Sequence, residues 1–259
     1  MLIKLAKLGF TVDGEWFCSN RCVEADAVRR LRQARSRELT PRAPGLRLGA
    51  VLLHQGVVTL RQLSEALEAQ RTSGLRLGAQ LQSLGHASRE VVLRALSAQN
   101  GISYLATIDL ASVRTAPGGL TIDEVRALGV VPFRETGDTL LIACAAPVPY
   151  SAIGALEVLS GRKVQPYLVA DDDFIQLVAE YASAAPALRS NTAQDISDGA
   201  ARIAALTAEA GDVTVTEALV DPFTWVRIDA NGRVSTLLVP PHAPESKENA
   251  EWLAGTTPL

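Results

Sequence analysis

The chain has 259 residues, of which 47% are hydrophobic, and its mean hydropathy of +0.14 argues against a disordered protein. This length allows one or two domains with buried cores. The net charge of −3 conceals an asymmetry, because residues 1–99 carry 15 Lys and Arg against 8 Asp and Glu, whereas residues 100–259 carry 10 against 20. The basic part suits an anionic partner, which by charge alone is a nucleotide, a nucleic acid or a membrane surface.

The sequence also bears on location and redox state. No stretch approaches the roughly 18 continuous apolar residues of a membrane span. Lys4 and Lys7 interrupt the apolar start, which makes it a poor secretory signal. Three cysteines are too few for a disulfide framework. We therefore expect a cytoplasmic protein with reduced thiols.

Residues 1–45 form the first predicted segment, which combines a knuckle-like start with a basic helix. Cys18 and Cys22 resemble one half of a zinc knuckle, and in the Leu5–Phe10 stretch leucines stand where a Cys-x-x-Cys half would have its sulfurs. Tetrahedral zinc needs four ligands, so we interpret this as a degenerate knuckle folded by its apolar residues. Residues 23–37 are predicted to form an arginine-rich helix, and residues 41–45 a linker.

A 24-residue pattern then occurs twice, in residues 47–70 and 76–99, with a five-residue spacer. The pattern is Arg-Leu-Gly-x-x-Leu-x-x-x-Gly-x-x-x-x-x-x-Leu-x-x-x-Leu-x-x-Gln. The first copy contains Arg47, Leu48, Gly49, Leu52, Gly56, Leu63, Leu67 and Gln70. The second contains Arg76, Leu77, Gly78, Leu81, Gly85, Val92, Leu96 and Gln99, with Val92 as the only departure. Such a tandem repeat indicates one supersecondary unit used twice.

Each copy is predicted to be a short helix, a turn and a longer helix, so that residues 46–100 form a small four-helix unit. Leucines recur at helical spacing, and Gly56 and Gly85 stand where glycines end helices. Thr59 followed by Gln62 is a capping-box pair, and Ser88 can cap the corresponding helix of the second copy.

The double pattern resembles the MshEN domain, a cyclic-di-GMP-binding module at the N-terminus of bacterial type II secretion and type IV pilus assembly ATPases. Looser similarity continues to about residue 183, through Val-Val-Pro-Phe at 130–133 and Leu-Leu-Ile-Ala at 140–143. The resemblance implies cyclic-di-GMP as the ligand, with no cofactor, and all sixteen pattern residues as candidate ligand-binding residues. It also implies a secretion or pilus motor as a partner.

The residue types suit such a ligand. The ligand has two equal halves, and two repeats can give each half the same surroundings. Arg47 and Arg76 begin helices and can pair with a phosphate or a guanine, and Gly49 and Gly78 would let a ligand approach the backbone. Leucines would face the purines, and Gln70 and Gln99 would reach base edges. The alternative is that the leucines form core and that Gly56 and Gly85 only end helices.

The rest of the chain is predicted to be mixed in structure. Residues 101–183 contain short strands at 102–108, 130–133, 139–144 and 164–169, with helices at 121–127, 152–159 and 171–181. In residues 184–240, a linker precedes a helix at 195–210, an extended run at 213–229, an Ala-Asn-Gly turn and a return strand at 234–239. Residues 241–259 are predicted to be disordered.

The predicted fold is therefore α+β: tandem helix-turn-helix repeats forming a small four-helix unit, then a small α/β-sheet module and a C-terminal helix-plus-hairpin unit. The corresponding segments are 1–45, 46–100, 101–183, 184–240 and 241–259.

Other features carry weaker hypotheses. Asp109 could reach the ligand site, and His54 and His86 are interpreted as surface residues. Asp171, Asp172 and Asp173 begin a helix, and helix capping explains them more simply than a metal. The arginines between residues 29 and 37 lack the interleaved aromatics of a nucleic-acid site, so nucleic acid is not the expected partner.

We expect no enzymatic activity. No Gly-x-x-x-x-Gly-Lys-Ser/Thr phosphate loop occurs, and no constellation for nucleophilic catalysis stands out. The chain is also short for a motor domain, so we expect no ATP hydrolysis. The leading hypothesis is a non-enzymatic cyclic-di-GMP receptor. The alternatives are a protein–protein scaffold that keeps the fold without binding nucleotide, and a nucleic-acid-binding adaptor that uses the N-terminal arginines.

Overall fold

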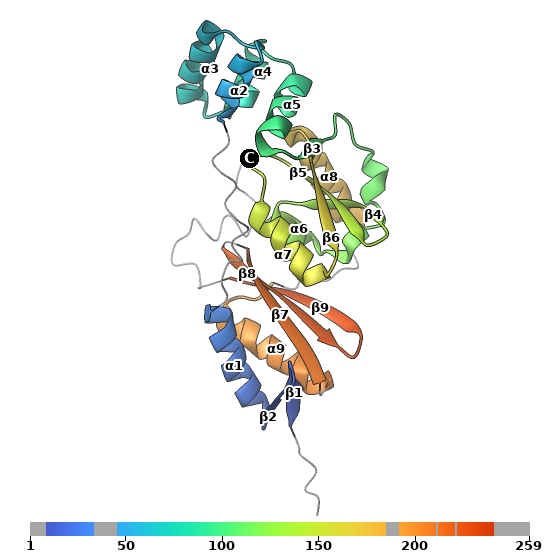
Figure 1. The fold of residues 1–259 in the computed structure, drawn as a ribbon. Helices are drawn as coiled ribbons and strands as arrows, with labels where there is room; N and C mark the ends of the chain where they lie inside the picture. The colour runs from blue at the N-terminus through green and yellow to red at the C-terminus, as the bar shows by residue number, and fades with distance from the viewer. Residues whose placement is uncertain (1–8, 34–45, 185–191, 211, 221, 241–259) are drawn as a thin grey trace, which may run out of the picture. The chain divides into compact units, whose positions relative to one another are not determined.

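The computed structural model describes residues 9–33, 46–184, 192–210, 212–220 and 222–240. The chain divides into two compact units (Figure 1). Unit 1 comprises residues 1–37, 155–161 and 190–259, and unit 2 comprises residues 38–154 and 162–189. Both combine helices with strands, so the predicted α+β class is confirmed. Within the described residues, no helix has the length and hydropathy needed to cross a membrane.

Unit 1 is built on a five-stranded sheet with the strand order β2-β1-β7-β8-β9. The strands are β1 (Phe10–Val12), β2 (Glu15–Phe17), β7 (Asp212–Val220), β8 (Phe223–Ala230) and β9 (Arg233–Val239). All neighbours are antiparallel except β1 and β7, which are parallel. Helices α1 (Asn20–Gln33) and α9 (Ile196–Ala210) pack against each other and contribute to a common core with β7 and β8. Strands from residues 10–17 and 212–239 therefore share one sheet.

Arg30, one of the arginines in the basic run, joins these distant segments. Its guanidinium donates to the Val215 carbonyl at 2.7 Å, to Asp13 Oδ2 at 2.6 Å and to Glu217 Oε2 at 3.0 Å. Arg29 is paired with Asp26 on the same helix. The carboxylates therefore neutralise two of the arginines that were compared with a nucleic-acid footprint.

The C-terminal unit differs from the prediction. The extended run expected over 213–229 is two strands, β7 and β8, which turn back at the Val220–Phe223 pair. The hairpin is thus a three-stranded antiparallel meander. The physical reason is visible in the sequence, because Pro222 has no backbone N–H for a strand ladder and interrupts the run. The predictions for residues 1–8, 34–45, 185–191 and 241–259 lie outside the described residues.

Unit 2 begins with the two repeats. The first forms α2 (Leu48–His54) and α3 (Leu60–Ser73), and the second forms α4 (Leu77–Ser83) and α5 (Arg89–Asn100), as predicted. The predicted capping box is present: the Thr59 side chain accepts from the Gln62 backbone N–H, and the Gln62 side chain accepts from the Thr59 N–H. Side chains from both repeats share one core that includes Leu52, Ala66, Leu81 and Ala95.

A four-stranded sheet with the order β3-β6-β5-β4 completes unit 2. Its strands are β3 (Ser103–Tyr104), β4 (Val131–Thr136), β5 (Thr139–Cys144) and β6 (Lys163–Leu168), with helices α6 (Ile122–Leu128) and α8 (Asp171–Ala184). Of helix α7 (Tyr150–Ser160), residues 150–154 belong to unit 2 and residues 155–160 to unit 1. The 3₁₀ turns η1 (Leu110–Val113) and η2 (Pro117–Gly119) were not predicted. The strand expected over 102–108 is only two residues long, because β3 pairs with β6 only at those two positions.

Candidate functional site

The two arginines of the repeats occupy equivalent backbone positions. Arg47 is the N-cap of α2 with φ −60° and ψ 145°, and Arg76 is the N-cap of α4 with φ −64° and ψ 149°. Neither side chain caps its helix, and both residues are exposed. The repeated sequence therefore produces the same local backbone structure twice.

Gly49 and Gly78 are buried by packing between the repeats. A Cβ on Gly78 would lie 2.7 Å from Val92 Cγ1 and 3.5 Å from Leu48 Cδ2. A Cβ on Gly49 would lie 3.0 Å from Leu63 Cδ1 and 3.4 Å from Leu77 Cδ2. Leu48 thus packs over Gly78 of the second repeat, and Leu77 packs over Gly49 of the first repeat. Glycine was expected to admit a ligand to the backbone, but protein side chains fill the space where each Cβ would stand.

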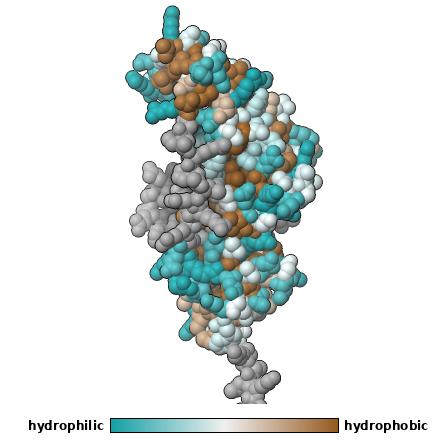
Figure 2. Space-filling model, in the orientation of Figure 1, coloured by the Kyte–Doolittle hydropathy of each residue, from teal (hydrophilic) through white to brown (hydrophobic). Residues whose placement is uncertain are grey.

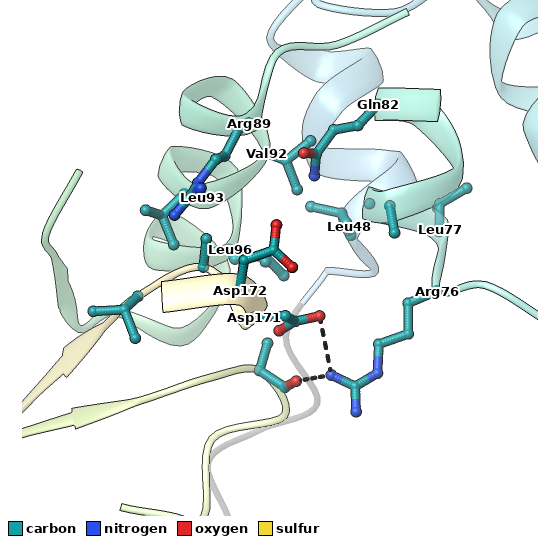
Figure 3. A pocket seen from close by; sticks show the side chains of 15 residues that line it. Leu48, Arg76, Leu77, Gln82, Arg89, Val92, Leu93, Leu96, Asp171 and Asp172 are labelled. Carbon is teal, nitrogen blue, oxygen red and sulfur yellow. Dashed lines mark hydrogen bonds and ion pairs between the residues drawn. The ribbon is translucent and has the colours of Figure 1, made fainter. Parts of the chain in front are cut away.

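A pocket of about 220 Å³ lies between the second repeat and the sheet of unit 2 (Figure 3). Its helical wall comes from α4 and α5, and its opposite wall from the loop after β5 and from the β6–α8 junction. Six predicted site residues line it: Leu48, Arg76, Leu77, Gly78, Val92 and Leu96. Nine further residues complete the lining: Ala79, Gln82, Arg89, Leu93, Ala146, Val169, Ala170, Asp171 and Asp172. Only Leu48 comes from the first repeat.

Charged groups surround the pocket. Arg76 donates a hydrogen bond to the Ala146 carbonyl, and one of its Nη atoms lies 3.7 Å from Asp171 Oδ2 (Figure 3). Arg89 forms an ion pair with Asp173. An anion that approached Arg76 would therefore have to compete with the carboxylate of Asp171.

The aspartates at the start of α8 consequently do more than begin a helix. Asp171 and Asp173 pair with arginines of the second repeat, and Asp172 lines the pocket. Over the described part of the chain, no group of three or more His, Cys, Asp or Glu side chains is arranged to hold a metal ion.

The corresponding surface of the first repeat is open. A shift of 29 residues relates the copies, so Leu60 corresponds to Arg89 and Leu67 to Leu96. Leu60 is 73% exposed and Leu67 is 45% exposed. Among the described residues, the Arg47 side chain has no hydrogen-bond or ion-pair partner, whereas its carbonyl accepts from the Ala50 and Val51 N–H groups. The two halves of the predicted site thus share a backbone but differ in their surroundings.

The remaining predicted residues lie away from the pocket lining. Leu52 and Leu81 are completely buried in the helical core, which is the packing role that the sequence left open. Gly56 and Gly85 adopt φ values of +67° and +72° just after their helices end, a conformation that favours glycine. Gln70 and Gln99 are half-buried. Leu63 packs at Gly49.

Three residues of the weaker hypotheses also have defined surroundings. Asp109 caps η1, its Oδ1 accepting from the Ala111 N–H at 2.9 Å, and it lines a different hollow beside Phe133. His86 Nε2 lies 3.1 Å from Glu65 Oε2, and His54 is exposed near the end of α2. None of the three lines the pocket of the second repeat.

The sequence prediction missed Gln82, Arg89 and the β6–α8 junction. Gln82 and Arg89 correspond to Leu53 and Leu60 in the first copy. Because these positions are not the same residue in both copies, they are not part of the repeated pattern. The junction lies more than 60 residues from the motif in the sequence. Helical periodicity shows which side chains of the second repeat lie on the same face as Arg76. Which residues line the opposite wall of the pocket is decided by how the sheet packs against α4 and α5.

Comparison with known proteins gives the family. Residues 100–188 match the MshEN domain, a range that follows both repeats. A solved structure described as MshE with cdg is 31% identical, covers 52% of this chain and 98% of its own, and has a TM-score of 0.43. Two structures of the N-terminal domain of XpsE are 17% and 20% identical. They cover 55% and 51% of this chain and 99% and 92% of their own, with TM-scores of 0.37 and 0.28.

A search of curated proteins found no match. The MshEN family model nevertheless matches residues 100–188. This part of the chain belongs to the MshEN domain family.

Proposed function

We propose that this chain is a non-enzymatic receptor for cyclic-di-GMP that acts in the cytoplasm on a secretion or pilus motor. The observation that carries the proposal is the pocket of the second Arg-Leu-Gly motif. It combines an apolar floor of Leu48, Leu77 and Leu96 with the Arg76 guanidinium at its edge. Such a floor suits a purine face, and a guanidinium can bind phosphate or the O6 and N7 edge of guanine.

The pocket volume indicates how the ligand would lie. A pocket of about 220 Å³ is smaller than the roughly 300–1,000 Å³ that encloses a drug-sized ligand. We infer that it takes one guanine nucleotide half. The other half would lie on the open face of the first repeat, where Arg47 and Leu60 are exposed. Leu48 and Leu77, which cross between the repeats, would contact the ligand near its centre.

Binding would require Arg76 to exchange partners. In the structure its guanidinium is shared between the Ala146 carbonyl and Asp171. Because Arg76 and Asp171 are both more than half exposed, their ion pair is weak and a ligand phosphate can displace it. The second repeat would then lose one of its links to the β6–α8 junction, which gives the ligand a physical means of altering unit 2.

Calorimetric titration of cyclic-di-GMP tests the proposal, with GTP as the control ligand. Loss of a charge-assisted hydrogen bond costs about 1.5–3 kcal/mol, so Arg76→Ala and Arg47→Ala should each weaken binding by about 10- to 100-fold. Arg71→Ala is the control, because this arginine carries the same charge and is also exposed but stands in the spacer. Asp171→Asn should strengthen binding by removing the competing carboxylate.

The proposal fails if the folded protein gives no heat with cyclic-di-GMP, or if Arg76→Ala binds as tightly as Arg71→Ala. The Asp171→Asn variant tests only the exchange of partners at Arg76. If its affinity for cyclic-di-GMP equals that of the wild type, the exchange is rejected but the receptor function is not. A steep salt dependence with single-stranded DNA or RNA in place of the nucleotide would favour the nucleic-acid adaptor.

One observation supports a protein-binding scaffold as the second candidate. Leu46, Leu60, Leu67 and Leu75 are each at least 43% exposed, and all belong to the helical part of unit 2. Figure 2 shows hydrophobic side chains gathered over this region. A scaffold would bind its protein partner equally well with and without cyclic-di-GMP, and Leu60→Asp would abolish that binding.

A further inference from the structure

Two exposed cysteines meet at the start of helix α1, in unit 1. Cys18 follows strand β2 and Cys22 lies in the first turn of α1. Their Sγ atoms are 3.1 Å apart. A disulfide bond is about 2.05 Å long, so closure requires the sulfurs to approach by about 1 Å. Cys18 precedes the helix, and its position is therefore not held by the α1 hydrogen bonds.

Ser19 adds a polar group to this pair. Its hydroxyl donates to Cys22 Sγ at 3.4 Å and lies 3.9 Å from Cys18 Sγ. Hydrogen bonds from Ser19 and then from Cys18 lower the pKa of the Cys22 thiol. Thiolate is the nucleophilic form of cysteine, and a lowered pKa increases its fraction near neutral pH.

Cys144 differs from this pair in its burial and in the pKa of its thiol. Its side chain is buried in strand β5, and burial raises the pKa of its thiol to about 12. It should therefore stay reduced and unreactive in the folded protein, which makes it an internal reference for the other two cysteines.

A metal site would need more ligands than these two sulfurs provide. Zinc takes four ligands in structural sites. Within the described residues, no third His, Cys, Asp or Glu side chain completes a metal-binding group with Cys18 and Cys22. Cys18 and Cys22 instead have the arrangement of a redox dithiol. One accessible thiol lies beside a second thiol that can react with its sulfenic acid to form a disulfide.

We propose that Cys18 and Cys22 form a redox site that a hydroperoxide oxidises to an intramolecular disulfide. The Cys22 thiolate attacks one peroxide oxygen, the O–O bond breaks, and Cys22 becomes a sulfenic acid as hydroxide leaves. The Cys18 thiol then loses its proton and attacks the Cys22 sulfur, forming the S–S bond and releasing a second hydroxide. With hydrogen peroxide, the two thiols become one disulfide and the peroxide is reduced to two waters.

The disulfide would join the end of β2 to the first turn of α1. Val23, Ala27 and Leu31 on this helix are part of the core of unit 1. Oxidation should thus restrain the β2–α1 turn and raise the thermal midpoint of unit 1 without rearranging its core. This inference is independent of nucleotide binding, and each can fail without the other.

The test uses the full chain, purified in reductant, desalted and treated with hydrogen peroxide. Intact mass spectrometry should show the loss of two hydrogen atoms. Peptide mapping after alkylation should place the bond between Cys18 and Cys22 and leave Cys144 alkylated as a free thiol. Thioredoxin or dithiothreitol should reverse the change.

Two variants separate the roles of the sulfurs. Cys18→Ser leaves Cys22 without its resolving partner, so a sulfenic acid that reacts with dimedone should accumulate at residue 22. Cys22→Ser should react with peroxide more slowly than Cys18→Ser. The inference is overturned if wild-type protein forms no Cys18–Cys22 disulfide while it remains folded. It is also overturned if the purified chain holds one zinc ion that protects both thiols from alkylation.

Discussion

Gly49 and Gly78 occupy the same place in the two repeats but face neighbours of different stiffness. The Cβ of an alanine at residue 78 would meet Val92 Cγ1 at 2.7 Å, and valine has few alternative rotamers. At residue 49 the nearest atoms are the δ-methyl groups of Leu63, at 3.0 and 3.2 Å, which are the ends of a flexible side chain. The single departure from the repeat pattern, Val92, therefore changes what its neighbouring glycine tolerates.

We predict that Gly78→Ala destabilises unit 2 and that Gly49→Ala has a smaller effect. Overpacking of a core typically costs about 1–3 kcal/mol, whereas alanine gains up to about 1 kcal/mol over glycine in a helix. A net loss of about 1 kcal/mol or more is expected at residue 78, measured by urea unfolding. In a Val92→Ala background, Gly78→Ala should cost much less. An equal cost in both backgrounds would show that the contact with Val92 is not the cause.

At the scale of elements, equal helices are placed in unequal surroundings. Helices α2 and α4 both have 7 residues and follow an arginine N-cap, and the longer α3 and α5 have 14 and 12 residues and follow Thr59 and Ser88. The β6–α8 junction lies across the pocket from α4–α5, and of the first repeat only Leu48 lines that pocket. A symmetric ligand would thus meet two chemically distinct halves.

At the β4 edge of the unit 2 sheet, Glu135 links strand β4 to the 3₁₀ turn η2. Glu135 on β4 accepts a hydrogen bond from the Gly118 N–H of η2 at 2.6 Å and pairs with Arg162 at 3.1 Å. The bond from Gly118, followed by Arg162, lowers the pKa of Glu135 below its usual 4.5. Because the folded state binds this proton less readily than the unfolded state, the ionised carboxylate stabilises the fold at neutral pH.

We predict that Glu135→Gln lowers stability above about pH 4.5, the usual pKa of this carboxyl group. The difference from wild type should disappear as the pH falls through the depressed pKa of Glu135. Urea midpoints from pH 7 to pH 3 would measure it, with Asp138→Asn as a charge-matched control in the adjacent turn. A difference that persists at the lowest pH would mean that the glutamine acts by shape and not by charge.

On the scale of the whole molecule, each unit has its own core and its own spectroscopic reporter. Trp16 and the buried Trp225 belong to unit 1, and the residues of unit 2 include no tryptophan. All four tyrosines of the chain belong to unit 2. Fluorescence excited at the tryptophan band therefore follows the unfolding of unit 1 alone.

We predict separate responses to core substitutions in the two units. Ile228→Ala, at a buried site of β8, should cost about 2–5 kcal/mol and lower the tryptophan-monitored midpoint. Gly78→Ala should instead lower the tyrosine-monitored midpoint and leave the tryptophan signal in place. If both variants shift both signals together, the units unfold as one cooperative body.

Much of the local structure followed from sequence pattern. The capping pair Thr59 and Gln62, the glycines after α2 and α4, and the repeated helices all depend on contacts within a few residues. The sequence predicts one extended run over residues 213–229, whereas Pro222, which has no N–H for a strand ladder, lies at the turn between β7 and β8. The 3₁₀ turns were missed because three or four residues carry too little periodicity.

Sequence by itself determined the helices of the repeats, the two arginines at their starts and the family resemblance, because these depend on local spacing. Only the tertiary structure decided what faces them. It placed Asp171 beside Arg76, filled the glycine positions with leucine and valine side chains, and joined β1 to β7 across 200 residues. It also brought the sulfurs of Cys18 and Cys22 within 3.1 Å. Contacts of this kind arise from how side chains and segments pack in space, and spacing along the chain does not encode that packing directly.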